Sequence, residues 1–202
     1  MKTKILTLIA MIFGTSLAAD SSLTSSFTSV SGTITAGSIS GNVSATGTSL
    51  SYTNIASNNL AYLGDFSYVT GSILGNAFTA TSFGGGMGYV FSNDLNRSEG
   101  SGSRTILGVT YGNSDVEVGS TSASSSNFGL AGQVGFALAA NLTTSLTLTA
   151  PIDSLGDIAY DSNIGYQTRI GQINISLGGA SSDEDGVSQS LTSWGLGYTS
   201  HF

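Results

Sequence analysis

Along most of the chain, large apolar or aromatic residues alternate with small polar ones. A β-strand sends successive side chains to opposite faces, so this period of two predicts strands with one apolar and one small polar face. The clearest internal example is residues 127–139, where Phe128, Leu130 and Phe136 oppose Gln133. The pattern therefore predicts an all-β chain.

Eight segments carry this pattern from residue 58 onward. They lie near residues 58–70, 81–92, 104–118, 127–139, 142–150, 157–168, 172–177 and 189–202. Most are close to the ~9 to 11 residues that a tilted membrane strand needs. Loops are predicted at residues 71–77 and 93–103, in the Ser-rich stretch after residue 118, after Pro151, and in the acidic run 181–186.

Residues 20–57 carry a weaker signal. Two weak strands near residues 27–38 and 42–54 are one interpretation, and a flexible lead segment or an insert in the lumen are the others. The chain has eight strands without this segment and ten with two strands in it. Both numbers are even, as in bacterial single-chain membrane barrels.

The face opposite the apolar one carries almost no charge. In a soluble β-sandwich, the alternative fold, that face meets water and normally carries Lys, Glu and Asp. Here it carries Gly, Ala, Ser, Thr and amides, with Asp65 and Asp161 as the few charges. A transmembrane barrel explains this better, because its large apolar residues face lipid and its small polar residues fill the interior.

The N-terminal residues have the layout of a secretory signal peptide. Lys2 and Lys4 precede an apolar run over residues 5–13, and Ser16 and Ala18 are small enough to flank a cleavage site. We therefore predict a signal peptide over residues 1–18 and an exported domain over residues 19–202. The apolar run is too short to span a bilayer as a helix.

The charge balance of the exported part is strongly acidic. No Lys follows residue 4, and the three arginines, Arg97, Arg104 and Arg169, stand against 12 acidic residues. Such a chain repels nucleic acid and offers no basic patch to bind it. The sequence also contains no Cys, which excludes disulfides and thiol chemistry.

The residue types that catalysis and metal binding need are scarce. His201 is the single histidine and no serine has an evident partner base, so we expect neither an enzyme nor a cofactor. The run Asp183, Glu184, Asp185 lacks the spacing and length of a calcium loop, so no metal site is expected.

Residues 189–202 (QSLTSWGLGYTSHF) place Trp194, Leu196, Tyr198 and Phe202 on one face. This segment resembles the C-terminal assembly signal of Gram-negative outer-membrane β-barrels, although Ser200 stands where that family more often has a bulky residue. The resemblance implies a transmembrane up-and-down antiparallel β-barrel of eight to ten strands in the bacterial outer membrane. Its expected partners are membrane lipid and, through this last strand, the barrel-assembly machinery.

The same resemblance places the C-terminus in the periplasm and orients the loops. The three arginines then fall at periplasmic turns, and an acidic rim forms at the outer surface from Asp153, Asp157, Asp183, Glu184 and Asp185. Two functions follow as expectations. One is a passive porin-like conduit for small solutes or cations, or a membrane-structural barrel, with Asp65 and Asp161 in a polar lumen. The alternative is a surface adhesion protein that binds a partner through its acidic loops.

Overall fold

A computed structural model describes residues 21–153, 157–184 and 187–202. These residues form ten β-strands: β1 (Ser21–Ala36), β2 (Ile39–Ile55), β3 (Leu60–Ile73), β4 (Asn76–Asn93), β5 (Ser103–Val118), β6 (Thr121–Ala139), β7 (Leu142–Pro151), β8 (Ile158–Gln167), β9 (Gln172–Glu184) and β10 (Val187–His201). In the described part of the chain, no helix is long and apolar enough to cross a membrane. The predicted signal peptide and Asp185 lie outside the described residues.

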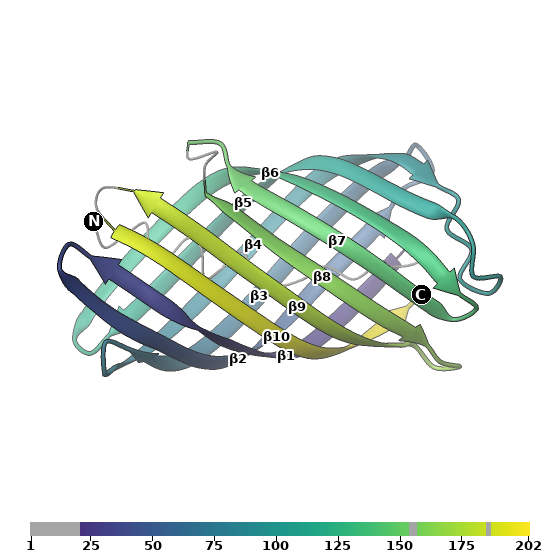
Figure 1. Cartoon of the computed structure of the whole chain (residues 1–202). Helices are drawn as coiled ribbons and strands as arrows, with labels where there is room; N and C mark the ends of the chain where they lie inside the picture. The colour runs from purple at the N-terminus through teal and green to yellow at the C-terminus, as the bar shows by residue number, and fades with distance from the viewer. Residues whose placement is uncertain (1–20, 154–156, 185–186) are drawn as a thin grey trace.

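The ten strands close into one antiparallel barrel (Figure 1). Each strand pairs with its neighbours in sequence, and β1 pairs with β10 from Ser22 opposite His201 to Ala36 opposite Val187. Closure gives every strand two partners and leaves no open sheet edge. The predicted fold class is therefore confirmed, and the number of strands is ten, the upper end of the predicted range of eight to ten.

Residues 20–57 supply the first two strands, so the two-strand interpretation was correct and the lead-segment and insert interpretations were wrong. β1 and β2 pair along their whole length, from Ala36 opposite Ile39 to Ser21 opposite Asn54. Their signal is weak because both faces carry many Ser, Thr and Gly residues. Backbone pairing, which does not depend on side-chain type, holds them in the sheet.

The predicted loops at one end of the barrel were too long. The loop at residues 71–77 is a two-residue turn, Leu74 and Gly75, and the Ser-rich stretch belongs largely to β6. The acidic run also extends β9 to Glu184, and Pro151 is the last residue of β7. Composition indicated loops here, but Ser, Thr and Asp pair through their backbones as well as other residues do. The strands β4, β5, β6 and β9 are therefore longer than a membrane span requires, whereas β7 with 10 residues is not.

Large apolar side chains point away from the barrel axis. Phe66, Leu107 and Trp194 are each about half exposed, whereas Ser67, Ile106 and Ser193 beside them are buried in the barrel. This outward face has the composition expected of a surface that meets lipid. The functional features of the chain therefore have to be sought in the lumen, at the two barrel ends and at the seam between β1 and β10.

Candidate functional site

The lumen is the enclosed space to which one face of every strand contributes. We call the end with the β1–β2, β3–β4 and β5–β6 turns the outer end. The opposite end, with Ser21 and His201, is the inner end.

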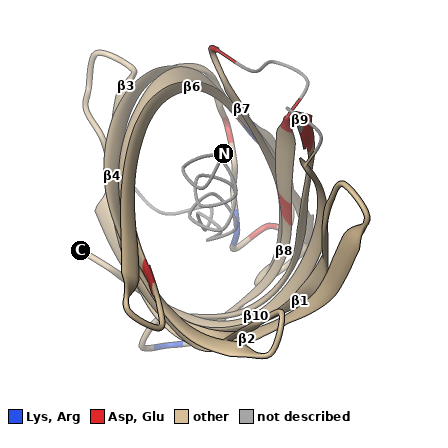
Figure 2. Ribbon diagram, turned by 90° about the vertical axis from the view of Figure 1, so that its left-hand side faces the viewer, with Lys and Arg blue, Asp and Glu red and all other residues tan. Residues whose placement is uncertain are grey.

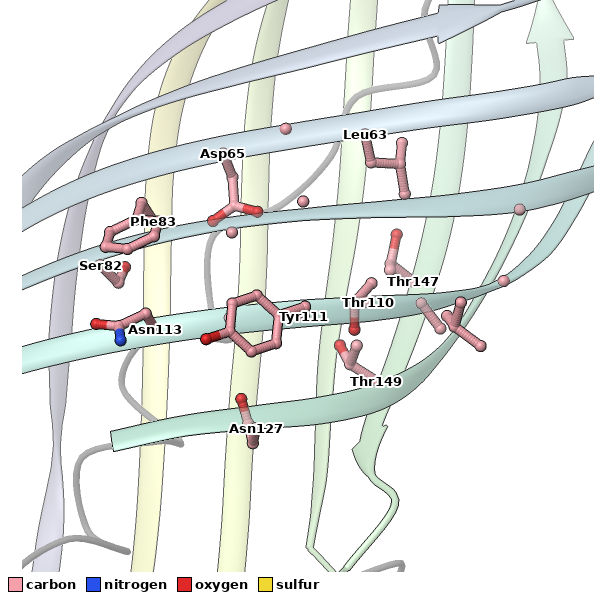
Figure 3. A pocket seen from close by; sticks show the side chains of 18 of the residues that line it. Leu63, Asp65, Ser82, Phe83, Thr110, Tyr111, Asn113, Asn127, Thr147 and Thr149 are labelled. Carbon is pink, nitrogen blue, oxygen red and sulfur yellow. The ribbon is translucent and has the colours of Figure 1, made fainter. Parts of the chain in front are cut away.

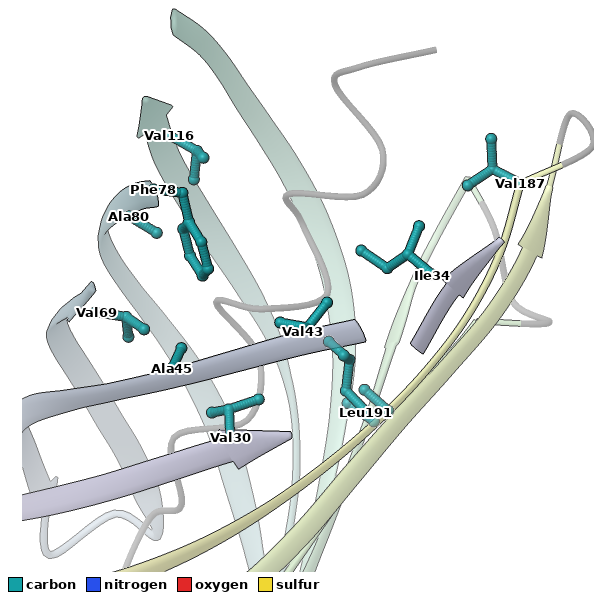
Figure 4. Close-up of a cluster of buried hydrophobic side chains, with 12 residues drawn as sticks. Val30, Ile34, Val43, Ala45, Val69, Phe78, Ala80, Val116, Val187 and Leu191 are labelled. Carbon is teal, nitrogen blue, oxygen red and sulfur yellow. The ribbon is translucent and has the colours of Figure 1, made fainter. Parts of the chain in front are cut away.

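Apolar side chains line the lumen toward the outer end (Figure 4). We call this set of 12 buried residues the outer collar. It consists of Val30, Ile34, Val43, Ala45, Val69, Phe78, Ala80, Val116, Ala159, Ala180, Val187 and Leu191. The prediction of a lumen lined throughout by hydroxyl and amide groups was therefore wrong for this part. On β1 apolar residues occur on both faces, with Leu23 and Phe27 outside and Val30 and Ile34 inside, so the pattern did not show which face is internal.

Below the outer collar the lumen wall carries hydrogen-bonded polar side chains beside a second apolar cluster of Ile55, Ala61, Val90 and Ile106. Thr24 of β1 and Thr199 of β10 lie 2.7 Å apart through their Oγ1 atoms, and Asn174 Nδ2 donates to Thr199 Oγ1 at 2.8 Å. Across β6 and β7, Gln133 Nε2 donates to Thr147 Oγ1 at 3.1 Å. These pairs join neighbouring strands and fix the polar belt in place.

Glycines leave one side of this belt without side chains. On β4 and β5, Gly84 is opposite Gly112 and Gly88 is opposite Gly108. A cavity of about 130 Å³ lies against this glycine floor (Figure 3). A cavity of similar size, ~150 Å³, is large enough for benzene. The cavity can therefore hold a small organic molecule.

Asp65 lies beside the glycine floor and contributes to the cavity wall. It is paired in register with Gly84, and a Cβ at that position would lie 2.8 Å from Asp65 Oδ1. The carboxylate thus occupies the space that the missing side chain of Gly84 leaves. Figure 3 shows this carboxylate on the strand next to the floor.

Asp161 lines the same cavity from β8. Its side chain is only 5% exposed, and neither carboxylate oxygen has a hydrogen-bond partner among the described residues. It is paired in register with Gly178, whose absent side chain leaves room for Oδ2. The barrel thus brings Asp65 and Asp161 to one cavity, although 95 residues separate them in the chain.

The inner end carries a buried arginine that the sequence reasoning placed in a turn. Arg104 is the second residue of β5, is 5% exposed, and donates from Nε to Asn93 Oδ1 at 2.8 Å. Arg104 is two residues before Ile106, so the period of two places both side chains on the lumen face. This was the signal in the sequence that could have placed Arg104 there. Arg97 lies in the β4–β5 connection and Arg169 in the β8–β9 turn, both at the inner end.

The connection between β4 and β5 at this end is held by Asp94. Its Oδ1 accepts hydrogen bonds from the backbone N–H of Ser103 at 3.0 Å and from the Ser92 hydroxyl at 3.0 Å. These bonds favour the charged form and lower the pKa of the Asp94 carboxyl. Asp94 therefore stabilises the connection between β4 and β5 and does not contribute a charge to the lumen.

Four residues of the predicted acidic rim, Asp153, Asp157, Asp183 and Glu184, are described and lie at the outer end, where Figure 2 shows acidic residues in red near β7 and β9. Asp153 follows β7, Asp157 precedes β8, and Asp183 and Glu184 end β9. In the described ranges, no group of three or more His, Asp and Glu side chains is placed to hold a metal ion. The described acids therefore give the outer end a negative charge.

The last strand makes specific contacts on the outer face of the barrel. Trp194 packs edge-on against Phe27 of β1 with ring centroids 6.4 Å apart, and Phe202 stacks on Tyr52 of β2 at 6.5 Å. Tyr198 Oη donates to the carbonyl oxygen of Ile170 at 2.5 Å, and Leu196 is half exposed between these aromatic residues. These contacts join β10 and the residue after it to β1, β2 and the turn between β8 and β9.

Deleting Phe202 is expected to reduce the yield of folded barrel several-fold. The deletion removes the Tyr52 stack and the hydrogen bond from Phe202 N to Ser21 O at 3.1 Å, which holds the inner end of the seam. Yield is measured as the heat-modifiable band of outer-membrane fractions on a detergent gel. Phe136→Ala, which removes another lipid-facing ring, is the control. An equal yield for the deletion and the wild-type chain would contradict the prediction.

Comparisons with known proteins agree with the architecture. No protein-family model and no curated protein matches the sequence. The transport unit of the autotransporter AIDA-I from Escherichia coli matches the structure with a TM-score of 0.50 and 11% identity, covering 98% of this chain and 97% of that one. Neisserial surface protein A matches with a TM-score of 0.47 and 12% identity, covering 93% of this chain and 100% of that one. The outer membrane protein OprG from Pseudomonas aeruginosa matches with a TM-score of 0.41 and 16% identity, covering 92% of this chain and 97% of that one. The chain has the fold of an outer-membrane β-barrel.

Proposed function

We propose that this protein is a passive conduit of the outer membrane through which small solutes pass, with a preference for cations. The observation that carries the proposal is the internal cavity bordered by Asp65 and Asp161. Two carboxylates in a lumen of low dielectric favour cations over anions, because water screens their field less there than at a surface. No Lys occurs in residues 21–202, and the three arginines lie at the inner end.

The strand number supports a conduit over a purely structural barrel. Eight strands enclose a space that side chains can fill, and the interior widens as strands are added. Ten strands with a glycine floor provide more room than eight strands of average composition. The outer collar is then the apolar part of the passage, which solutes with apolar groups can contact.

Adhesion through the outer loops is the weaker alternative. Between β1 and β2, β3 and β4, and β5 and β6, the connections have two residues each. Turns this short offer little surface for a macromolecular partner, since stable interfaces use ~20–30 residues a side. The acidic rim is compatible with both functions, so it does not favour adhesion.

Planar-bilayer recording tests the conduit. We expect the wild-type barrel to show cation-selective conductance, and Asp65→Asn combined with Asp161→Asn to reduce that selectivity several-fold by removing both lumen charges. Asp115→Asn is the matched control, because Asp115 is an exposed residue of β5 on the face opposite the lumen residues Ser114 and Val116. A silent bilayer, or selectivity unchanged in the double variant, would contradict the proposal.

A further inference from the structure

The carboxylate of Asp161 lacks a counter-charge in the described barrel. It is buried, faces the cavity, and both oxygens are without hydrogen-bond partners among the described residues. A buried carboxylate without compensation costs several kcal/mol, so such a group normally takes up a proton or has a cation or donors next to it. The arginines are at the inner end, whereas Asp161 is only three residues from the outer end of β8.

The surroundings of Asp161 are apolar on the outer side. Ala159, two residues toward the outer end on the same face, belongs to the outer collar and is paired with Ala180, another collar residue. The cavity itself is bounded by Leu63, Ile106 and Ala131 as well as by the glycine floor. The unpartnered carboxylate therefore lies where an apolar wall meets a small cavity.

These surroundings discriminate between kinds of cation. An inorganic ion must lose water along the apolar collar, and the described residues hold no group of three or more His, Asp and Glu side chains to replace that water. An ammonium ion with a compact apolar group loses less, because its apolar part contacts the collar and the cavity wall. The volume of about 130 Å³ suits a group of the size of one aromatic ring.

We propose that the cavity beside Asp161 is a binding site for small organic ammonium ions that carry an apolar group. The ammonium group pairs with the Asp161 carboxylate, and the apolar group lies against the glycine floor, Leu63 and Ile106. This inference rests on the proposed conduit, since it names the class of solute that the conduit would select.

Isothermal titration calorimetry with benzylammonium chloride tests the site, with the full barrel in phosphatidylcholine nanodiscs and empty nanodiscs as the blank. We expect saturable binding to the wild-type barrel and at least tenfold weaker binding to Asp161→Asn. Benzyl alcohol, which has the same ring without the charge, should also bind at least tenfold more weakly. Asp115→Asn, the matched loss of charge on the opposite face, should bind within twofold of wild type.

A second variant tests the cavity without changing any charge. A Cβ at Gly112 would meet only Asn127 Oδ1, at 3.5 Å, so Gly112→Leu fills part of the cavity without a backbone clash. We expect it to weaken benzylammonium binding at least tenfold, and a heat-modifiable gel band confirms that each variant has folded.

The proposal is overturned if benzylammonium does not bind to the wild-type barrel. It is also overturned if Asp161→Asn or Gly112→Leu binds benzylammonium as tightly as the wild-type barrel, or if benzyl alcohol binds to the wild-type barrel as tightly as benzylammonium. The calorimetric result is independent of conductance. Binding together with a silent bilayer supports the ammonium site and rejects the conduit. Selective conductance without binding retains the conduit and rejects the site.

Discussion

Replacing Gly32 by valine should prevent closure of the barrel, whereas the same replacement at Gly64 should leave it closed. Gly32 lies on β1, opposite Leu191 in the seam with β10. A Cβ there would overlap the carbonyl oxygen of Ser190 and lie 2.8 Å from Leu191 Cα, both backbone atoms that cannot rotate away. Gly64 is on the lipid-facing side of β3, where a Cβ would meet no atom within 4 Å.

The expected effect at Gly32 is large because the seam joins the first strand of the sheet to the last. If β1 cannot approach β10, both strands keep an unpaired edge, which hydrocarbon does not tolerate. We expect Gly32→Val to reduce the heat-modifiable, protease-resistant fraction at least tenfold and Gly64→Val to leave it within twofold of wild type. If both variants fold equally well, the seam does not have the packing described above.

Arginine should be far more destabilising at Val109 than at its neighbour Thr110. Val109 lies on β5 between two other exposed apolar residues, Leu107 and Tyr111, so its side chain points outward from the middle of the apolar band. A basic residue on the lipid face at the bilayer midplane costs about 2–4 kcal/mol. Thr110 points to the lumen and lines the cavity that Asp65 and Asp161 border.

An arginine at Thr110 therefore meets carboxylates instead of lipid, and we expect it to cost about 1 kcal/mol or less. The free energy of unfolding in urea, measured on barrels inserted into liposomes, distinguishes the two variants. Because the same replacement by arginine is made at two adjacent positions, the pair tests which face of β5 meets lipid and which faces the lumen. A larger loss for Thr110→Arg than for Val109→Arg would show that the faces had been exchanged.

The sequence by itself determined the fold class and most of the wall. From residue 58 onward, one face carries residues such as Phe66, Phe136 and Trp194, and the other carries small residues, so strand type and sidedness follow from the period of two. The same parity placed Asp65 and Asp161 on the inner face. Local alternation is enough for these conclusions because a strand with one strongly apolar face has only one stable orientation in a membrane.

Tertiary structure decided what local alternation left open. Val30 and Ile34 of β1 alternate with small residues and on sequence alone suit a lipid face, yet register with Ala45, Gly41 and the residues of β10 turns them into the outer collar. Only the curvature of the whole sheet brings Asp161 of β8 to the cavity that Asp65 of β3 borders, since β3 and β8 do not pair. The physical reason is that pairing with neighbouring strands sets the orientation of a weakly patterned strand. The lumen is created by ten strands together and by none of them alone.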